Sequence, residues 1–225
     1  MSRRVALVLL VVFAVPALAL AADTDPKKRI NPADQRRATS IVLKRSDFAA
    51  GWKKVPNTPD NGAEPTCPGY NPDHSDLTLT GEVEAEFEAT DGIPSVSSIA
   101  NIYKTKRDAL AAWTRSAKPA LAACLARFFK QAVEGEGGKA AIVRSGVLPF
   151  PKAAPRTVAY RAVLNLIVTE GGKETKVPVT IHFVALGSGR GYSVLLTMGF
   201  GNGIAVADLR AFAKLTASRL AAAKL

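Results

Sequence analysis

The two cysteines of this chain could form a reactive thiol, a metal site or a disulfide. Cys67 lies in a proline-rich segment, and Cys124 lies among alanines and leucines in the sequence KPALAACLARFF. A reactive thiol needs a histidine partner in a partly exposed, electropositive place, and a metal site needs more ligands than two thiols. Two lone cysteines in an oxidising compartment normally pair instead. We therefore expect a Cys67–Cys124 disulfide, which would stabilise the fold by about 4 kcal/mol through chain entropy.

The two histidines of the chain, His74 and His182, are candidate site residues. His74 lies in the sequence DHSD, whose two carboxylates could help it hold a divalent cation or act in hydrolysis. The preceding Asn71-Pro72-Asp73 explains the same composition as turn chemistry. His182 alternates with Ile181 and Phe183 and therefore faces the other side of its strand. There it is either a ligand-facing residue or a hydrogen-bonded one.

The sequence motifs of catalysis are incomplete or absent. Gly199 and Gly201 lead from a predicted strand toward a predicted helix, but Ile204 stands where a dinucleotide-binding fingerprint needs its third glycine. The sequence contains no G-x-S-x-G and no H-E-x-x-H. We therefore predict that the protein is not an enzyme and that it uses no metal and no cofactor.

The first 22 residues have the composition of a secretory signal peptide. Arg3 and Arg4 precede an apolar run that ends in small residues. An uncleaved membrane anchor is the alternative, because this run approaches the length of a membrane span, but Pro16 argues against it. We predict a secreted or cell-envelope protein with a signal peptide at 1–22, a flexible lead-in at 23–32 and a single α+β domain at 33–225.

The formal net charge of +11 limits the partners that this chain can have. Outside the cytoplasm, such an excess favours anionic envelope polymers or lipid head groups, and hence peripheral contact with membrane or wall. Nucleic acid is a poor partner, because the chain has no recognisable nucleic-acid motif and secretion removes the opportunity. A solvated basic surface without a partner is the alternative. The sequence does not indicate the oligomeric state.

Hydrophobic periodicity predicts the elements that would position these residues. Val83, Ala85 and Phe87 alternate with glutamates, which predicts a strand with one buried face. The glutamates could attract a cationic ligand, pair with basic neighbours or form a solvated face. The predicted elements are a helix at 32–43, strands at 82–88 and 96–103, a helical segment from 105 that breaks near Pro119, strands at 140–148, 156–169, 175–186 and 191–200, and a helix at 205–222.

Hairpin-length connections between the later strands require antiparallel pairing. We therefore predict an α+β fold in which an antiparallel sheet of about five to six strands is covered by N-terminal, central and C-terminal helices.

Several segments resemble a known family. The segment from Leu43 to Trp52, the sequence RDALAAWTRSAKPALAACLARF and the sequence VPVTIHFVALGSGRGYSVLLTMGF resemble actinobacterial secreted proteins related to the extracellular sensor domain of mycobacterial serine/threonine kinases. The order of elements is similar to that of PsbP-like α+β domains. The chain carries no kinase domain, and it has one possible disulfide where those sensor domains usually carry two.

The resemblance implies a ligand-binding or envelope-associated role without a cofactor. It also implies a cleft between the sheet and the long helix, with Trp52, Tyr103 and Trp113 as candidate ligand contacts and core packing as their alternative role. We expect a secreted, sensor-like or ligand-binding domain that takes an apolar or anionic envelope component. The alternatives are a basic scaffolding protein on cell-wall polymers and, third, an uncharacterised hydrolase that uses His74 or His182.

Overall fold

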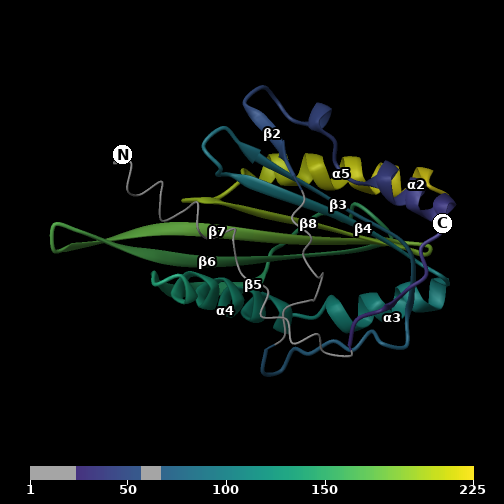
Figure 1. Ribbon diagram of the computed structural model, residues 1–225, viewed down its shortest axis with the longest axis horizontal. Coiled ribbons are helices and arrows are strands. Elements are labelled where there is room, and N and C mark those ends of the chain that lie inside the picture. The colour runs from purple at the N-terminus through teal and green to yellow at the C-terminus, as the bar shows by residue number, and fades with distance from the viewer. Residues whose placement is uncertain (1–23, 57–66) are drawn as a thin grey trace.

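The computed structural model describes residues 24–56 and 67–225, which form an eight-stranded sheet between helices. The strand order is β1-β3-β4-β8-β7-β6-β5, and β2 also pairs with β3. Helices α2 and α5 lie on one side of the sheet, and α3 and α4 lie on the other (Figure 1). The predicted signal peptide lies outside the described residues. No helix in the described part of the chain is long and apolar enough to cross a membrane.

The elements have the following bounds. The strands are β1 (Lys27–Lys28), β2 (Trp52–Val55), β3 (Thr78–Ala89), β4 (Ser95–Tyr103), β5 (Lys139–Val147), β6 (Arg156–Glu170), β7 (Lys173–Ser188) and β8 (Gly191–Phe200). The helices are α2 (Pro32–Ile41), α3 (Lys106–Ser116), α4 (Ala120–Gly135) and α5 (Val206–Ala222), with a short 3-10 helix, η2 (Arg45–Asp47).

The α+β class is confirmed, but the predicted sheet of about five to six antiparallel strands is too small. The sequence missed β1 and β2, because these short strands are rich in lysine and show no clear alternation. Strand β1 also makes the sheet mixed, since it runs parallel to β3. The lead-in that was expected to be flexible is hydrogen-bonded to this edge, where the Arg29 amide donates to the Leu79 carbonyl at 2.8 Å.

The predicted break near Pro119 is confirmed. Helix α3 ends before this proline and α4 begins after it, because proline has no amide hydrogen for the helical ladder. The two helices follow one another in nearly one line along the sheet (Figure 1). They therefore cover the sheet with the width of a single helix.

On the opposite side, α2 and α5 lie next to each other and enclose the largest apolar core. The ring of Phe48 lies 4.5 Å from Phe87 of β3 and 4.9 Å from Phe212 of α5, measured between centroids. Gly81 permits the close approach of α2, since a Cβ at this position would lie 2.5 Å from the Asp34 carbonyl oxygen. This contact sets α2 directly on β3.

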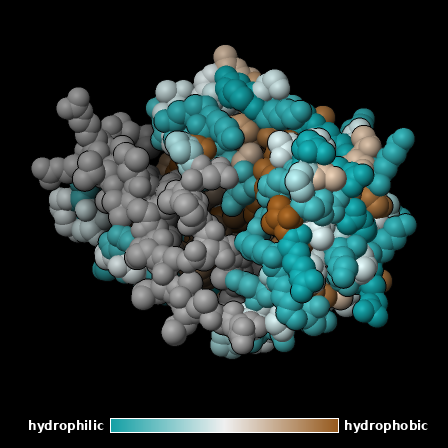
Figure 2. Space-filling model, turned by 45° about the vertical axis from the view of Figure 1, so that its right-hand side comes forward, coloured by the Kyte–Doolittle hydropathy of each residue, from teal (hydrophilic) through white to brown (hydrophobic). Residues whose placement is uncertain are grey.

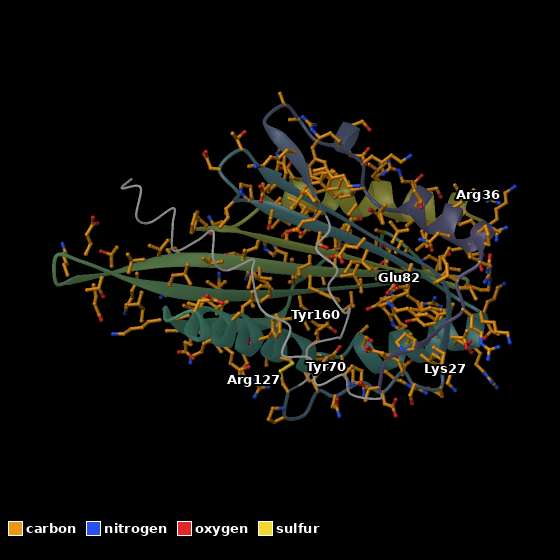
Figure 3. All side chains as sticks on the ribbon, in the orientation of Figure 1. Lys27, Arg36, Tyr70, Glu82, Arg127 and Tyr160 are labelled. Atoms are coloured by element: carbon orange, nitrogen blue, oxygen red, sulfur yellow. A yellow bond between two sulfur atoms is a disulfide. The ribbon has the colours of Figure 1, made fainter. Side chains whose placement is uncertain are left out.

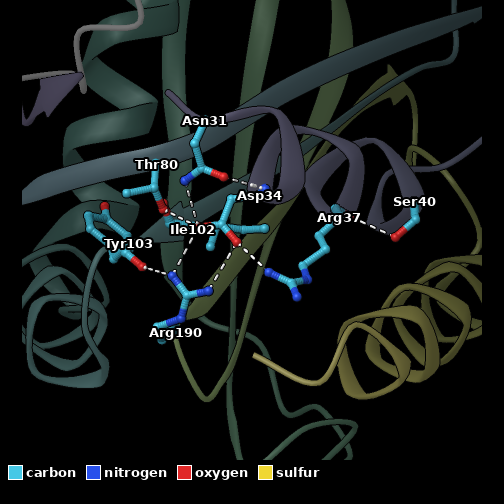
Figure 4. Close-up of polar contacts among 8 residues, drawn as sticks. All are labelled: Asn31, Asp34, Arg37, Ser40, Thr80, Ile102, Tyr103 and Arg190. Atoms are coloured by element: carbon cyan, nitrogen blue, oxygen red, sulfur yellow. Dashed lines mark hydrogen bonds and ion pairs between the residues drawn. The ribbon is translucent and has the colours of Figure 1, made fainter. Parts of the chain in front are cut away.

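A nearly buried ion pair fixes α2 to the far end of the sheet (Figure 4). The Arg190 guanidinium, at the turn between β7 and β8, donates to both carboxylate oxygens of Asp34 at 3.0 and 3.1 Å. Asp34 is 4% exposed and also accepts from the Thr80 hydroxyl at 2.7 Å. Donation from Arg190 outweighs the opposing effect of burial and holds the pKa of Asp34 well below its usual range.

The remaining surface shows no large apolar area in the view of Figure 2. The described residues there are mostly hydrophilic, and hydrophobic residues appear singly or in small groups. Scattered hydrophobic residues of this kind are normal on a protein surface and need no partner.

Removing Arg190 should strongly destabilise the fold. In Arg190→Ala, Asp34 keeps its position but loses its strongest counter-charge, so we expect a loss of about 3 kcal/mol in the free energy of unfolding. Because the folded pKa of Asp34 is depressed, the stabilisation is fully present at neutral pH. It begins to be lost as pH falls below about 4, and the rest is lost only as pH falls through the depressed folded pKa. Denaturant unfolding at pH 7 and at pH 3 measures both effects.

Arg37→Ala is the matched control. Arg37 contacts the same carboxylate at 2.8 Å, but its side chain is 44% exposed. Its removal should cost less than about 1 kcal/mol. Equal losses of unfolding free energy in the two variants would contradict the expectation that the more buried Arg190–Asp34 pair contributes more than the Arg37–Asp34 pair.

Candidate functional site

Cys67 and Cys124 form the predicted disulfide, with their Cα atoms 5.5 Å apart. The bond ties the segment before β3 to α4, and Figure 3 shows it close to Tyr70 and Arg127. The Tyr70 hydroxyl donates to the Ser116 carbonyl at 2.9 Å, which adds a second tie at the α3–α4 junction. Tyr70 and Cys124 share a core cluster with Leu121 and Tyr160. The sulfur atoms are therefore structural.

In the DHSD sequence, the histidine and the carboxylates contact different partners. His74 is buried, and its Nε2 lies 3.0 Å from the Ser116 hydroxyl. The carboxylate of Asp76 faces Arg115, whose donation lowers the pKa of Asp76. An open polar depression of about 430 Å³ lies here, lined by Asn71, Pro72, Asp73, Ser75, Asp76, Arg115 and Lys118. Among the described residues, no group of three or more His, Cys, Asp or Glu side chains could hold a metal ion.

The sheet separates the candidate ligand contacts from one another. Trp52 packs on Phe48 with 4.8 Å between ring centroids, on the α2–α5 side. Tyr103 and Trp113 belong to a cluster on the α3 side, where Trp113 meets the edge of Tyr192 at 5.9 Å. One ligand on one side of the sheet cannot contact all of these aromatic residues.

His182 lies on the α2–α5 side and is 1% exposed. Its Nδ1 lies 3.4 Å from the Thr197 hydroxyl. Burial lowers the pKa of His182, and the neighbouring positive charge of Arg161 lowers it further. The sequence leaves two roles open for His182, ligand-facing or hydrogen-bonded, and these contacts fit the hydrogen-bonded role.

Helix width leaves part of the α3–α4 side of the sheet half-covered. Helix α4 packs on β5 and β6, and α3 packs on β4 and β8. A helix with its side chains is about 10 Å wide, whereas neighbouring strands are about 4.8 Å apart. One helix therefore covers about two strands. Beside α4, no helix of the described residues packs on β3, β4 and β8.

One row of residues crosses this half-covered surface, and we call it the Glu86 row. The strand registers place Glu86 beside Ser97, Ser97 beside Leu196, Leu196 beside Phe183, and Phe183 beside Tyr160. Tyr160 is 1% exposed under α4, whereas the other members are half-buried. Cover is thus complete only under α4, and the end of the row on β3 is a half-buried carboxylate.

Glu86 differs from the other glutamates of β3. Glu82 pairs with Lys28 at 2.6 Å, Glu88 pairs with Lys53 at 2.9 Å, and Glu84 accepts from the Ser97 hydroxyl at 2.7 Å. Glu86 makes no hydrogen bond or ion pair with any residue that the structure describes. Burial raises its pKa, and the charges of Glu84 and Glu88 raise it further. The sequence indicates the glutamate stripe, but it gives no sign that Glu86 lacks a counter-charge among the described residues.

A small apolar cavity lies beside the row. It has a volume of about 20 Å³ and is lined by residues that include Phe129, Leu164, Ile181 and Met198. This is about the space of one water molecule, so an alkyl chain does not fit into it without movement of the lining side chains. Binding on this side would therefore use the surface of the sheet.

Comparison of the chain with family models and with curated proteins finds no match. The resemblance to actinobacterial sensor domains and to PsbP-like domains therefore stays a prediction.

Replacing both cysteines should weaken the fold without abolishing the sheet. In Cys67→Ser with Cys124→Ser, the unfolded chain regains the entropy of a loop spanning 57 residues. We expect the free energy of unfolding to fall by about 4 kcal/mol. Denaturant unfolding of the wild type with and without reductant, next to the double variant, measures the change. A reductant effect on the double variant, or none on the wild type, would contradict this assignment.

Proposed function

We propose that the protein is a secreted, non-enzymatic ligand-binding domain of the cell envelope that takes a small amphiphilic cation on the Glu86 row. The observation that carries the proposal is a half-buried carboxylate, Glu86, without a counter-charge in the described part of a chain with a net charge of +11. An ionised group in such a place costs stability unless something pairs with it. Groups that are kept at this cost are concentrated at functional sites.

The chemistry of the row supports a ligand with two parts. An ammonium or guanidinium group would pair with the carboxylate of Glu86. Leu196 and Phe183 are half-buried and offer apolar surface to a chain or ring attached to that group. The Ser97 hydroxyl lies between the polar and apolar parts.

The Glu86 row ends in a carboxylate, whereas the net charge of the whole chain is positive and predicts an anionic partner. A net positive chain favours an anionic partner, but the local charges of β3 would repel one. A cation is the better fit at the Glu86 row because local carboxylates decide a short-range contact. The secreted and non-enzymatic parts of the proposal rest on the signal-like leader, the disulfide and the lack of a complete catalytic motif.

A matched ligand series tests the charge requirement. Ten-carbon chains that bear an ammonium, a hydroxyl or a carboxylate share the same apolar part, so only the ammonium should bind tightly to the wild type. In Glu86→Gln, affinity for the ammonium should fall about tenfold, whereas Glu134→Gln on α4 should leave it unchanged. Titration calorimetry measures the affinities. Equal binding of all three chains, or equal effects of the two variants, would remove the basis of the proposal.

Binding of the ammonium chain should also weaken in acid. Because the pKa of Glu86 is raised, its carboxylate becomes neutral at a pH above the usual value of about 4.3 for glutamate. Affinity should therefore fall as pH decreases from 7 through this raised pKa, and Glu86→Gln should show no such dependence.

For the same reason, Glu86→Gln should be more stable than the wild type at pH 7, and this difference should vanish below pH 4. Denaturant unfolding across this range checks the second effect.

A further inference from the structure

On the α2–α5 side, strands β5, β6 and β7 extend beyond the helices. Helix α2 packs on β3 and β4, and α5 packs on β7 and β8. The hairpin of β6 and β7 projects past α5 (Figure 1). Strand β5 is the outer strand at this edge and is mostly exposed. The outer part of the sheet on this side is therefore open to solvent along β5 and the end of the β6–β7 hairpin.

Strand registers gather cations from three separate strands on this surface, which we call the β5–β7 basic face. Lys139, Ile167 and Lys176 form one row across β5, β6 and β7. Arg161 lies beside His182, on the α2–α5 side. Arg144 lies beside Val163, two residues from Arg161 along β6, and so on the same side of the sheet.

The charges of the basic face are available to a partner. Lys139, Arg144 and Lys176 are exposed, and Arg161 is half-buried. Arg144, Arg161 and Lys176 form no ion pair with any described residue. Lys139 lies 3.6 Å from Glu174, but their side chains are 69% and 59% exposed, so this pair is weak. The lowered pKa of His182 agrees with an Arg161 charge that is not neutralised.

The spacing of the cations favours a partner with repeated anionic groups. Lys139 and Lys176 lie two strand spacings apart, roughly 10 Å, and Arg144 and Arg161 are diagonal neighbours at roughly 7–8 Å. One phosphate cannot bridge these distances, but successive phosphates of a chain can. Asn165 lies between the two cation pairs and is half-buried, so its amide can donate to the same chain.

We propose that the β5–β7 basic face docks a polymer that carries phosphate groups along its chain, such as a phosphate-bearing polymer of the cell wall. Arginine suits this partner because its guanidinium donates two parallel hydrogen bonds to a phosphate. A membrane is the poorer partner, because the described residues of this face include no aromatic side chain of the kind that inserts at a membrane interface. The proposal does not depend on the Glu86 row, which lies on the other side of the sheet.

Inorganic polyphosphate is the probe, and two double variants with the same charge change test the site. Arg144→Ala with Lys176→Ala removes cations from the basic face, and Arg210→Ala with Lys214→Ala removes exposed cations from α5. The first variant should bind polyphosphate about tenfold more weakly than the wild type. Its plot of log affinity against log salt should lose about 0.7 in slope for each cation removed. The control variant should stay within about twofold of the wild type.

Two further ligands separate the polymer from other anions. Inorganic phosphate should bind far more weakly than polyphosphate, and vesicles that contain phosphatidylglycerol should not bind preferentially. Equal losses in the two double variants would overturn the proposal, since only net charge would then matter. Preferential binding to vesicles, equal binding of single phosphate, or salt-independent binding would overturn it as well. Thermal unfolding of each variant confirms that the surface changes leave the fold intact.

Discussion

This structure depends on one constraint, which is that a single helix is much narrower than the sheet on which it packs. From β3 to β5 the sheet is six strands wide, or roughly 24 Å, whereas one helix covers about 10 Å. On one side α3 and α4 lie in line and supply a single helix width. On the other side α2 and α5 lie next to each other and supply two. Each side therefore keeps a strip of sheet that no helix of the described residues covers, and the two strips lie over different strands.

Three contacts distant in sequence hold α2 and α4 in these positions. The Asp34–Arg190 ion pair joins α2 to the turn between β7 and β8, and Gly81 lets α2 rest on β3. On the opposite side, the Cys67–Cys124 disulfide joins the segment before β3 to α4. These contacts fix which strands each helix covers, and hence which strands stay open. None of the three contacts faces a proposed ligand, so their role in the proposed binding would be to position the helices.

The two open strips carry opposite charge although the whole chain is strongly basic. The strip beside α4 ends in the carboxylates of β3, with Glu86 lacking a counter-charge among the described residues. The strip beside α5 carries lysine and arginine from three strands. A cation and a polyanion can therefore approach the same sheet from its two sides without competing. Net charge indicates neither arrangement, since it averages over both strips.

The sequence by itself determined the elements whose pattern is local. Alternation around Phe87 predicts a strand, Pro119 predicts the break between two helices, and two lone cysteines in a chain with a signal-like leader predict their bond. Strands β1 and β2 escaped prediction because two to four residues are too few to show a period. The alternation also gave the correct side for His182 relative to Ile181.

Only the tertiary structure decided which residues are neighbours. Period two assigns a side chain to a face, but it does not say which strand lies beside it or what covers that face. The cleft that the resemblance implies would hold both Trp52 and Trp113, but the sheet lies between them. The place of Glu86 at the end of its row, and the gathering of Arg144 with Arg161, depend on which strands pair and in which register. The pairing of β4 with β8 joins parts of the chain that lie far apart in sequence, so it is set by the packing of the whole sheet and not by a local stretch of sequence.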